Sequence, residues 1–251
     1  RQISLLSSLS FRETFHKKQS SRKHLQMANS TFNPIVEKTV LQWSISRSGS
    51  TLVNRILRNI FSEVHYFHPI DCIVQVFGCR VQGFGGFPTK EFPTICTIRN
   101  PIDTAASLVR ISKKKQEEHM SICHDSLDHH RNFWEFVDSI RDDGKDVVIL
   151  KYESFWNNFD YIFKKLENRF NGAIDKENRD LMKRDFSISS HLDIQTKIGN
   201  SFNCIDDKSG VHGSHIQNPK PKTAQAIFDC RMIESLQKEF KEFTVRWEEV
   251  E

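Results

Sequence analysis

The stretch "SISRSGSTLVNRIL", residues 44–57, begins with the pattern of a buried strand and ends with that of an amphipathic helix. The strand pattern covers residues 38–45, so only a few residues separate it from the helix. A run of small polar residues with one arginine stands at this junction. The helix places Leu52, Val53, Ile56, Leu57, Ile60 and Phe61 on one stripe and Asn54, Arg55, Arg58 and Asn59 opposite.

The junction has the chemistry of a phosphate-binding turn. Amides at a helix start have no partner within the helix, and the helix dipole places partial positive charge there. Gly49 permits a tight turn and a close approach by an anion. Arg47 adds a full charge with forked donors. We therefore predict an anion site made of Arg47, Ser48, Gly49, Ser50 and Thr51, with simple helix capping by these residues as the alternative.

The junction differs from the nucleotide-triphosphate loop GxxxxGK[ST]. That pattern needs a glycine where this chain has Ser44 and a lysine where it has Ser50. The later strands also end without an aspartate, since one ends at Arg99 and the other in Lys151-Tyr152-Glu153. A magnesium ligand of the NTPase kind is therefore not apparent.

Strand and helix patterns alternate along the rest of the chain. Such alternation implies crossover connections and a mostly parallel sheet covered by helices on both faces. The sequence thus predicts an α/β, single-domain P-loop-type fold. Further strands are expected at 64–70, 92–99 and 146–153, and helices after Asn100-Pro101, over 126–143, over 155–170, irregularly over 171–200 and over 223–243, with a loop at 201–221.

Bulk properties describe an ordinary globular chain. The 251 residues suit one substantial domain, with 37% hydrophobic and 27% charged residues. Residues 1–26 contain six Lys/Arg against one acid, so the net charge of +4 leaves about −1 for the remainder. This balance argues only weakly for a nucleic-acid partner, and we expect none. We expect 1–33 to be a basic tail, whether a targeting segment, a flexible arm or translated leader sequence, and 34–251 to be the domain.

The chain also carries signals about location. No apolar run reaches the ~20 residues needed to span a bilayer. The six cysteines are scattered without a CxxC pair or a disulfide framework, which favours a reducing compartment. We expect a cytoplasmic protein, with organelle targeting by the tail as the alternative.

A second strand–helix junction, "TIRNPIDTAASL" (97–108), contains two further residues of interest. Asn100, Pro101 and Asp103 suit the cap and first turn of a helix, so they have a structural explanation. Arg99 and Ser107 do not. An arginine at the end of an apolar strand and a serine in the second helical turn would place a cation and a hydroxyl around another anion.

The two junctions together resemble the sulfotransferases that use 3′-phosphoadenosine 5′-phosphosulfate (PAPS). In that family an "RSGST"-like loop binds the 5′-phosphosulfate, and an "IRNPxDxxxS" segment binds the 3′-phosphate. The resemblance covers 38–243 and implies that residues 47–51 form the first site and Arg99 and Ser107 the second. "VVILKYESF" (147–155) is similar to the family's strand with Tyr-Glu, and "HGSHIQNPKP" (212–221) to a late loop that brings His215 to the nucleotide.

The reaction also needs a base for the acceptor. Carbohydrate-type members carry a glutamate in a "FEP"-like string after the second strand, and Phe67-His68-Pro69 aligns with it without a gap. A neutral imidazole can accept a proton near pH 7. His68 is therefore the leading catalytic candidate beside Arg47, with Glu63 and Asp71 as alternates. The alternative for His68 is that it merely ends a strand.

The resemblance implies transfer of a sulfuryl group from PAPS to a hydroxyl or amine of a small-molecule or carbohydrate acceptor, without a metal. Sulfuryl transfer develops less negative charge than phosphoryl transfer, so fixed cations and amides can stabilise it. The His- and Cys-containing run "CHDSLDHH" (123–130) follows no zinc spacing. The alternatives are a small-molecule kinase with a degenerate loop and a non-enzymatic anion or nucleic-acid binding module.

Overall fold

The structure is a computed structural model that describes residues 36–67, 93–112, 114–145, 147–199 and 222–250. Four strands form one sheet in the order β2-β1-β3-β4, and every neighbouring pair is parallel. This confirms the predicted α/β fold with a parallel sheet. The strands are β1 (Val36–Ser44), β2 (Phe61–Phe67), β3 (Thr94–Ile98) and β4 (Val147–Lys151).

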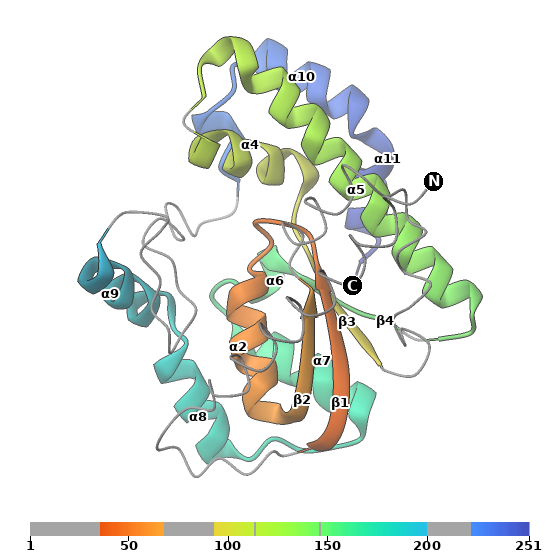
Figure 1. Cartoon of the computed structure of the whole chain (residues 1–251), viewed down its shortest axis with the longest axis vertical. Coiled ribbons are helices and arrows are strands. Elements are labelled where there is room, and N and C mark those ends of the chain that lie inside the picture. Colours follow the sequence, from red (N-terminus) through yellow and green to blue (C-terminus); the bar gives the residue numbers. More distant parts are fainter. Residues whose placement is uncertain (1–35, 68–92, 113, 146, 200–221, 251) are drawn as a thin grey trace, which may run out of the picture.

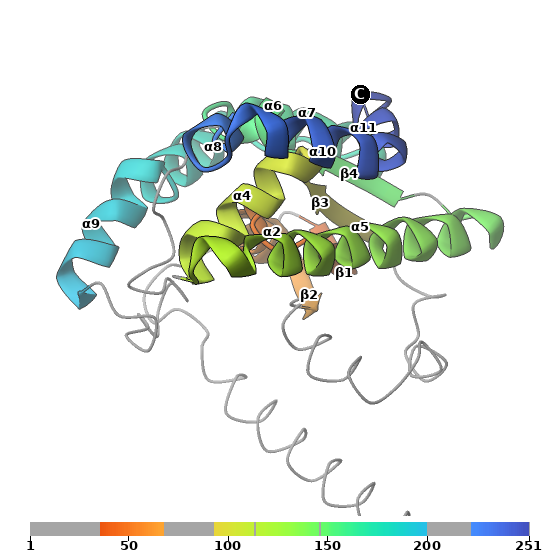
Figure 2. The same cartoon turned by 90° about the horizontal axis from the view of Figure 1, so that it is seen from above.

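Helices cover both faces of this sheet (Figures 1 and 2). One group packs on the face that carries Leu41, Cys96 and Ile149, and the other packs on the face that carries Val40 and Ile95. The first group comprises α4 (Pro101–Ser112), α5 (His119–Asp142), α10 (Cys230–Glu239) and α11 (Lys241–Glu248), and the second comprises α2 (Ser50–Ile60), α6 (Tyr152–Phe155), α7 (Phe159–Phe170) and α8 (Lys176–Asp185).

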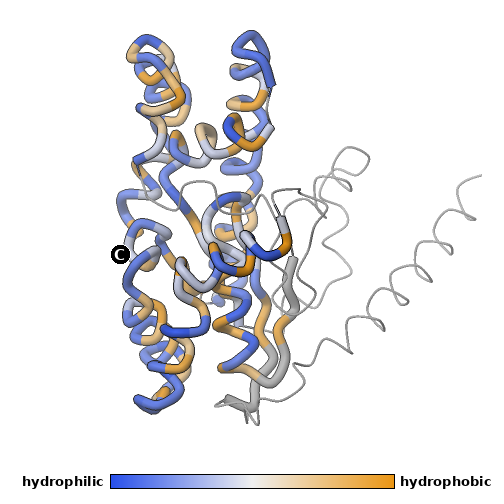
Figure 3. Tube along the Cα trace, turned by 90° about the vertical axis from the view of Figure 1, so that its left-hand side faces the viewer, coloured by the Kyte–Doolittle hydropathy of each residue, from blue (hydrophilic) through white to orange (hydrophobic). Residues whose placement is uncertain are grey.

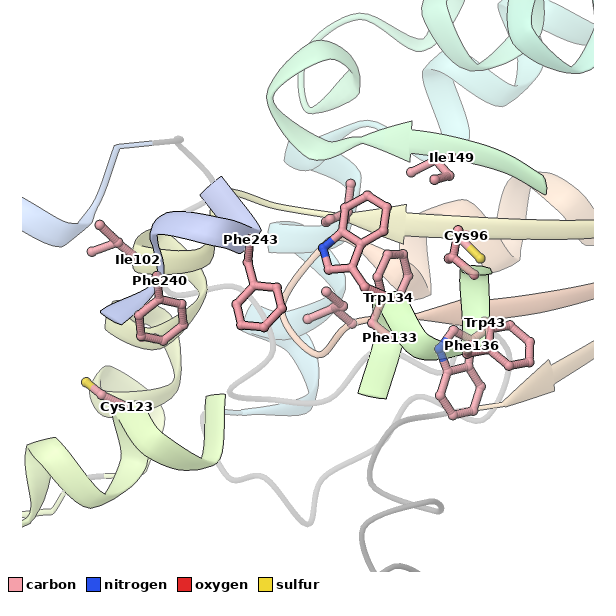
Figure 4. Close-up of a cluster of buried hydrophobic side chains, with 14 of the residues drawn as sticks. Trp43, Cys96, Ile102, Cys123, Phe133, Trp134, Phe136, Ile149, Phe240 and Phe243 are labelled. Atoms are coloured by element: carbon pink, nitrogen blue, oxygen red, sulfur yellow. The ribbon is translucent and has the colours of Figure 1, made fainter. Parts of the chain in front are cut away.

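Neighbouring strand residues divide between the two cores because side chains alternate across a strand. On the first face, Trp43 lies against Phe136 of α5, with ring centroids 4.9 Å apart. Figure 4 shows this aromatic core, in which Phe240 and Phe243 from the end of the chain join residues of α4 and α5. The C-terminal helices therefore complete the cover over the sheet.

The remaining helical elements lie at the periphery. Helix α9 (Ile188–Ile198) projects from α8 at one end of the molecule (Figures 1 and 2). Two short 3-10 helices, η2 (Gln116–Glu118) and η3 (Ala224–Ala226), precede α5 and α10. Coloured by hydropathy, the helices change between hydrophobic and hydrophilic residues along their turns (Figure 3). No helix in the described ranges is long and apolar enough to cross a membrane.

The helix after the first junction differs from its prediction in two ways. Phe61 is not its last apolar residue but begins β2, with an extended backbone and its ring 4.8 Å from that of Phe170. Asn54 and Asn59 were expected on the solvent face, and both are buried. They are buried because each amide is paired, Asn54 with the side chain of Gln42 and Asn59 with the carbonyl of Arg55.

Two predicted single helices are each interrupted. Residues 155–170 contain the end of α6, a turn and then α7. Residues 223–243 form η3, α10 and part of α11, because Asp229 starts a new helix by accepting from the amide of Met232 at 2.8 Å. The apolar period continued through these breaks, so periodicity alone did not reveal them.

Two buried histidines, His130 in α5 and His191 in α9, pair with backbone carbonyls of their own helices or caps. His130 of α5 donates from Nδ1 to the carbonyl of Ser126 at 2.8 Å, and burial lowers its pKa to about 4. His191 of α9 donates to the carbonyl of Ser187 at 3.0 Å, and its Nε2 accepts from Arg55 at 2.7 Å. Burial, then the charge of Arg55, lowers the pKa of His191 to about 4. Both side chains are therefore neutral in the folded state at pH 7.

These pKa values predict loss of stability in acid. The folded pKa of about 4 lies below the unfolded value near 6.5, so each histidine's contribution is present above pH 6.5 and is lost as pH falls toward 4. Each should remove about 2 kcal/mol between pH 7 and 5. Denaturant unfolding should show a weaker pH dependence in His191→Gln than in wild type, whereas exposed His124→Gln should behave like wild type. An unchanged dependence in His191→Gln would contradict this account.

Candidate functional site

Arg47 and Arg99 lie at the carboxyl edge of the sheet, where the strand order changes direction. From β1 the chain passes through α2 to β2 on one side, whereas β3 pairs with β1 on the other side. In open parallel sheets this switch point is where ligands bind. Arg47 follows β1 and Arg99 follows β3, so the two predicted anion sites adjoin each other at this switch point.

The turn after β1 has a strained backbone. Arg47 has φ 67°, an uncommon value for a residue with a side chain, and Gly49 has φ 78°. Gly49 is the N-cap of α2, and its carbonyl accepts the first helical bond from the amide of Val53 at 3.1 Å. A residue without a side chain therefore starts the helix. The stretch therefore caps α2, as the alternative interpretation expected, but through Gly49 and without a side-chain hydroxyl.

Ser48 shapes the turn from inside. Its side chain is fully buried, and its hydroxyl donates to the carbonyl of Ile45 at 2.5 Å and contacts the hydroxyl of Thr97 at 2.6 Å. Its amide donates to the same carbonyl at 3.4 Å. Thr97 belongs to β3, so Ser48 links the turn to the neighbouring strand. In this conformation the polar atoms of Ser48 are occupied within the protein, and its contribution to a site is to set the shape of the turn.

A buried polar network supports the turn from below, and the sequence analysis missed it. Gln42 of β1 donates to the carbonyl of Ser50 at 2.9 Å and to the hydroxyl of Ser44 at 3.3 Å. The side-chain amide of Asn54 donates to the side-chain oxygen, Oε1, of Gln42 at 2.9 Å. Gln42, which stands between the apolar residues Leu41 and Trp43, was the sequence feature that could have indicated a buried polar contact. Such a paired network fixes one position for the start of α2.

The two arginines are joined through residues of both junctions. Nε of Arg47 donates to Ser107 of α4 at 3.2 Å, and Arg99 donates to the carbonyl of Arg47 at 3.5 Å. Arg99 also donates to the hydroxyl of Thr223 at 3.2 Å, and its guanidinium lies 4.8 Å from the centroid of the Tyr152 ring. Arg47, Arg99 and Ser107, all predicted from sequence, are thus brought together. Thr223 and Tyr152 were not predicted for this site.

Burial and like charge make the site electropositive. Burial, and then the neighbouring charge of Arg99, lowers the pKa of Arg47 to about 10, so Arg47 stays protonated at neutral pH. Arg99 is 3% exposed. Two desolvated cations this close repel each other, and an anion between them would relieve the repulsion.

The one carboxylate of α4, Asp103, accepts hydrogen bonds from backbone amides and not from either arginine. Asp103 accepts from the amide of Lys222 at 2.6 Å, that of Thr223 at 2.7 Å and that of Ala224 at 2.9 Å. It thereby fastens the segment that leads into η3 and holds Thr223 against Arg99. Asn100 accepts from the amides of Ile102 and Asp103, so its expected capping role is confirmed.

The predicted Tyr-Glu segment after β4 also has a structural role here. Glu153 accepts from the amide of Asn100 at 2.8 Å and from the indole of Trp247 at 3.2 Å. Burial raises its pKa. Glu153 therefore connects the second junction to α11, and Tyr152 supplies the ring beside Arg99.

Several predicted residues lie outside the description. His68, Asp71 and His215 fall in ranges that the structure does not describe, and of Glu63 only the backbone is placed, paired with Thr39. Thr51, by contrast, is the second residue of α2 and is partly buried. The assignments of His68 and His215 stay predictions. Within the described ranges no group of three or more His, Cys, Asp or Glu side chains could coordinate a metal.

No protein-family model matches this chain, and no curated protein matches it by sequence. Among solved structures, mouse sulfotransferase SULT7A1 complexed with PAP aligns with a TM-score of 0.53, covering 83% of this chain and 85% of its own at 14% identity. The chain has a sulfotransferase fold. Retinol dehydratase in complex with androsterone and inactive cofactor PAP aligns with a TM-score of 0.49 over 82% of this chain and 80% of its own, at 13% identity.

The loop of this sulfotransferase fold depends on glycine at position 49. A Cβ there would meet Tyr152 at 2.9 Å and Phe155 at 3.0 Å, and φ 78° disfavours any side chain. Gly144 has a similar φ of 72° with open space around it, so Gly144→Ala is a matched control. We expect Gly144→Ala to cost about 1 kcal/mol and Gly49→Ala about 1–3 kcal/mol more. Denaturant unfolding of both variants measures the difference, and equal costs would disprove close packing of the turn against Tyr152.

Proposed function

We propose that this protein transfers a sulfuryl group from PAPS to a hydroxyl or amine of a small-molecule or carbohydrate acceptor. The observation that carries the proposal is the meeting of Arg47, Ser107 and Arg99 at one switch point, with Arg47 and Ser107 3.2 Å apart. Two anion-binding motifs at one crevice suit a donor with phosphate groups at both ends. The fold that the chain shares with a PAP-bound sulfotransferase supports the same donor.

The donor roles follow from the arrangement of the two junctions. Arg47 and the amides at the start of α2 would bind the 5′-phosphosulfate, with Ser48 and Gly49 shaping the turn and Ser50 and Thr51 adding hydroxyls. Arg99 and Ser107 would bind the 3′-phosphate, and His215 would approach the nucleotide from the late loop. Because these donors are fixed and partly desolvated, they stabilise charge more strongly than water does.

In the proposed transfer, His68 accepts the proton of the acceptor hydroxyl as the acceptor oxygen forms a bond to sulfur. The bond between sulfur and the bridging phosphate oxygen breaks, and its electron pair leaves with adenosine 3′,5′-bisphosphate (PAP). Arg47 neutralises the charge that develops on this leaving phosphate. Glu63 and Asp71 are the alternative bases.

Donor selectivity tests the proposal directly. PAP at a concentration of a hundred times its Kd should raise the melting temperature by roughly 5–10 °C. ATP with magnesium should raise it little. Arg47→Ala and Arg99→Ala should each lose most of the PAP shift, while the exposed control Arg231→Ala retains it. Stabilisation by ATP and magnesium instead would favour the kinase alternative.

The base assignment has its own test. His68→Ala should bind PAP like wild type in calorimetry but lose turnover by roughly 100-fold or more, because general-base catalysis contributes that much. Sulfation assays with labelled PAPS across alcohols, phenols, amines and sugars supply both the acceptor and the rate. Wild-type turnover in His68→Ala would show that His68 is not the base. Glu63→Gln and Asp71→Asn would then test the two alternative bases.

A further inference from the structure

Helix α4 presents a stripe of three polar residues, Asp103, Ser107 and Arg110, at spacings of four and three. Residues with these spacings lie on one face of a helix. Asp103 binds the amides of residues 222–224, and Ser107 accepts from Arg47 at 3.2 Å. Two members of the stripe therefore contact segments that adjoin the two arginines at the switch point. Arg110 extends the same face by about 4.5 Å along the helix.

Arg110 adds a third positive charge beside Arg47 and Arg99. The pKa of Arg47 is lowered mainly by burial and then by the charge of Arg99, while Tyr152 raises it. The charge of Arg110 makes a further, smaller contribution that lowers this pKa. Within the described part of the chain, Arg110 makes no hydrogen bond or ion pair. The carboxylates around Tyr152 and Arg99 are engaged elsewhere, Asp103 with backbone amides and Glu153 with Asn100 and Trp247. Among the described residues, no carboxylate pairs with this partly exposed cation beside two other arginines.

We infer that Arg110 is a positioning residue for the donor, pairing with the same 3′-phosphate that Ser107 and Arg99 would bind. The inference rests on the proposed function and adds a residue to its donor site. A phosphate monoester carries a charge of about −1.5 to −2 at pH 7 and three acceptor oxygens, so one arginine leaves it incompletely neutralised. Ser107 contacts Arg47 and lies three residues before Arg110 on the same helix face, so a phosphate bound at Ser107 would lie within reach of both arginines.

The inference gives Arg110 a defined selectivity. A cation that pairs with the 3′-phosphate strengthens binding of PAP but contributes little to adenosine 5′-monophosphate, which lacks this group. A cation that only raises the general positive potential would strengthen binding of both nucleotides. The ratio of the two affinities therefore separates a specific pair from a general field.

Isothermal titration calorimetry of the full chain with each nucleotide measures this ratio. We expect Arg110→Ala and Arg110→Gln to weaken PAP binding by roughly 10-fold or more, because each removes a charge-assisted hydrogen bond. Binding of adenosine 5′-monophosphate should change less than twofold. Arg231→Ala removes an equal charge from an exposed position on α10 and should change neither affinity. Two substitutions at position 110 guard against a folding defect in one of them.

The other outcomes overturn the inference in distinguishable ways. Unchanged PAP affinity in both Arg110 variants, while Arg99→Ala loses it, would reject Arg110 and leave the proposed function intact. If the Arg110 variants bind PAP and adenosine 5′-monophosphate more weakly by the same factor, Arg110 contributes only to the general positive potential and does not pair with the 3′-phosphate. A raised KM for the acceptor with unchanged PAP affinity would assign it to the acceptor instead. Absence of PAP binding by the wild-type chain would reject the inference together with the proposed function.

Discussion

The approach of a partly buried arginine, Arg47, to a fully buried one, Arg99, at the sheet edge is the constraint on which the rest of this structure depends. Arg47 and Arg99 come from different strands, and Arg99 contacts the carbonyl of Arg47 at 3.5 Å although their charges repel. Taking cations out of water is costly unless donors and charges are satisfied. Ser107, Thr223 and the Tyr152 ring each satisfy part of this requirement. We regard the remaining positive potential as the property that selects an anionic ligand.

The scaffold around this pair fixes positions instead of supplying countercharge. Ser48 joins the turn to β3, and Gln42 and Asn54 fix the start of α2 from beneath. The carboxylate of Asp103 accepts hydrogen bonds from three backbone amides and so anchors the segment that carries Thr223. A carboxylate that paired with either arginine would compete with a bound phosphate. Fastening the site with amides and hydroxyls keeps its charge available for an anion.

Much of this arrangement could be predicted from the sequence, because it depends on local patterns. The alternation of strands and helices gave the parallel sheet, and the two junctions identified Arg47, Arg99 and Ser107 before their proximity was known. Long-range pairing was out of reach: nothing in the pattern linked Asp103 to residues 222–224, 119 positions or more away. The prediction for Asn54 was wrong for the same reason. A polar residue on a helix was expected to face solvent, but Asn54 is buried and pairs with Gln42. The breaks at Phe61 and Asp229 were missed because the apolar period of the sequence continues through them.

The central claim is that one crevice binds both ends of a doubly phosphorylated adenosine. A crystal structure of the chain with PAP tests it most directly. The account predicts the 5′-phosphate at the amides that begin α2, beside Arg47, and the 3′-phosphate within hydrogen-bond distance of Arg99 and Ser107. A nucleotide bound in full occupancy elsewhere, with neither phosphate contacting these residues, would contradict it.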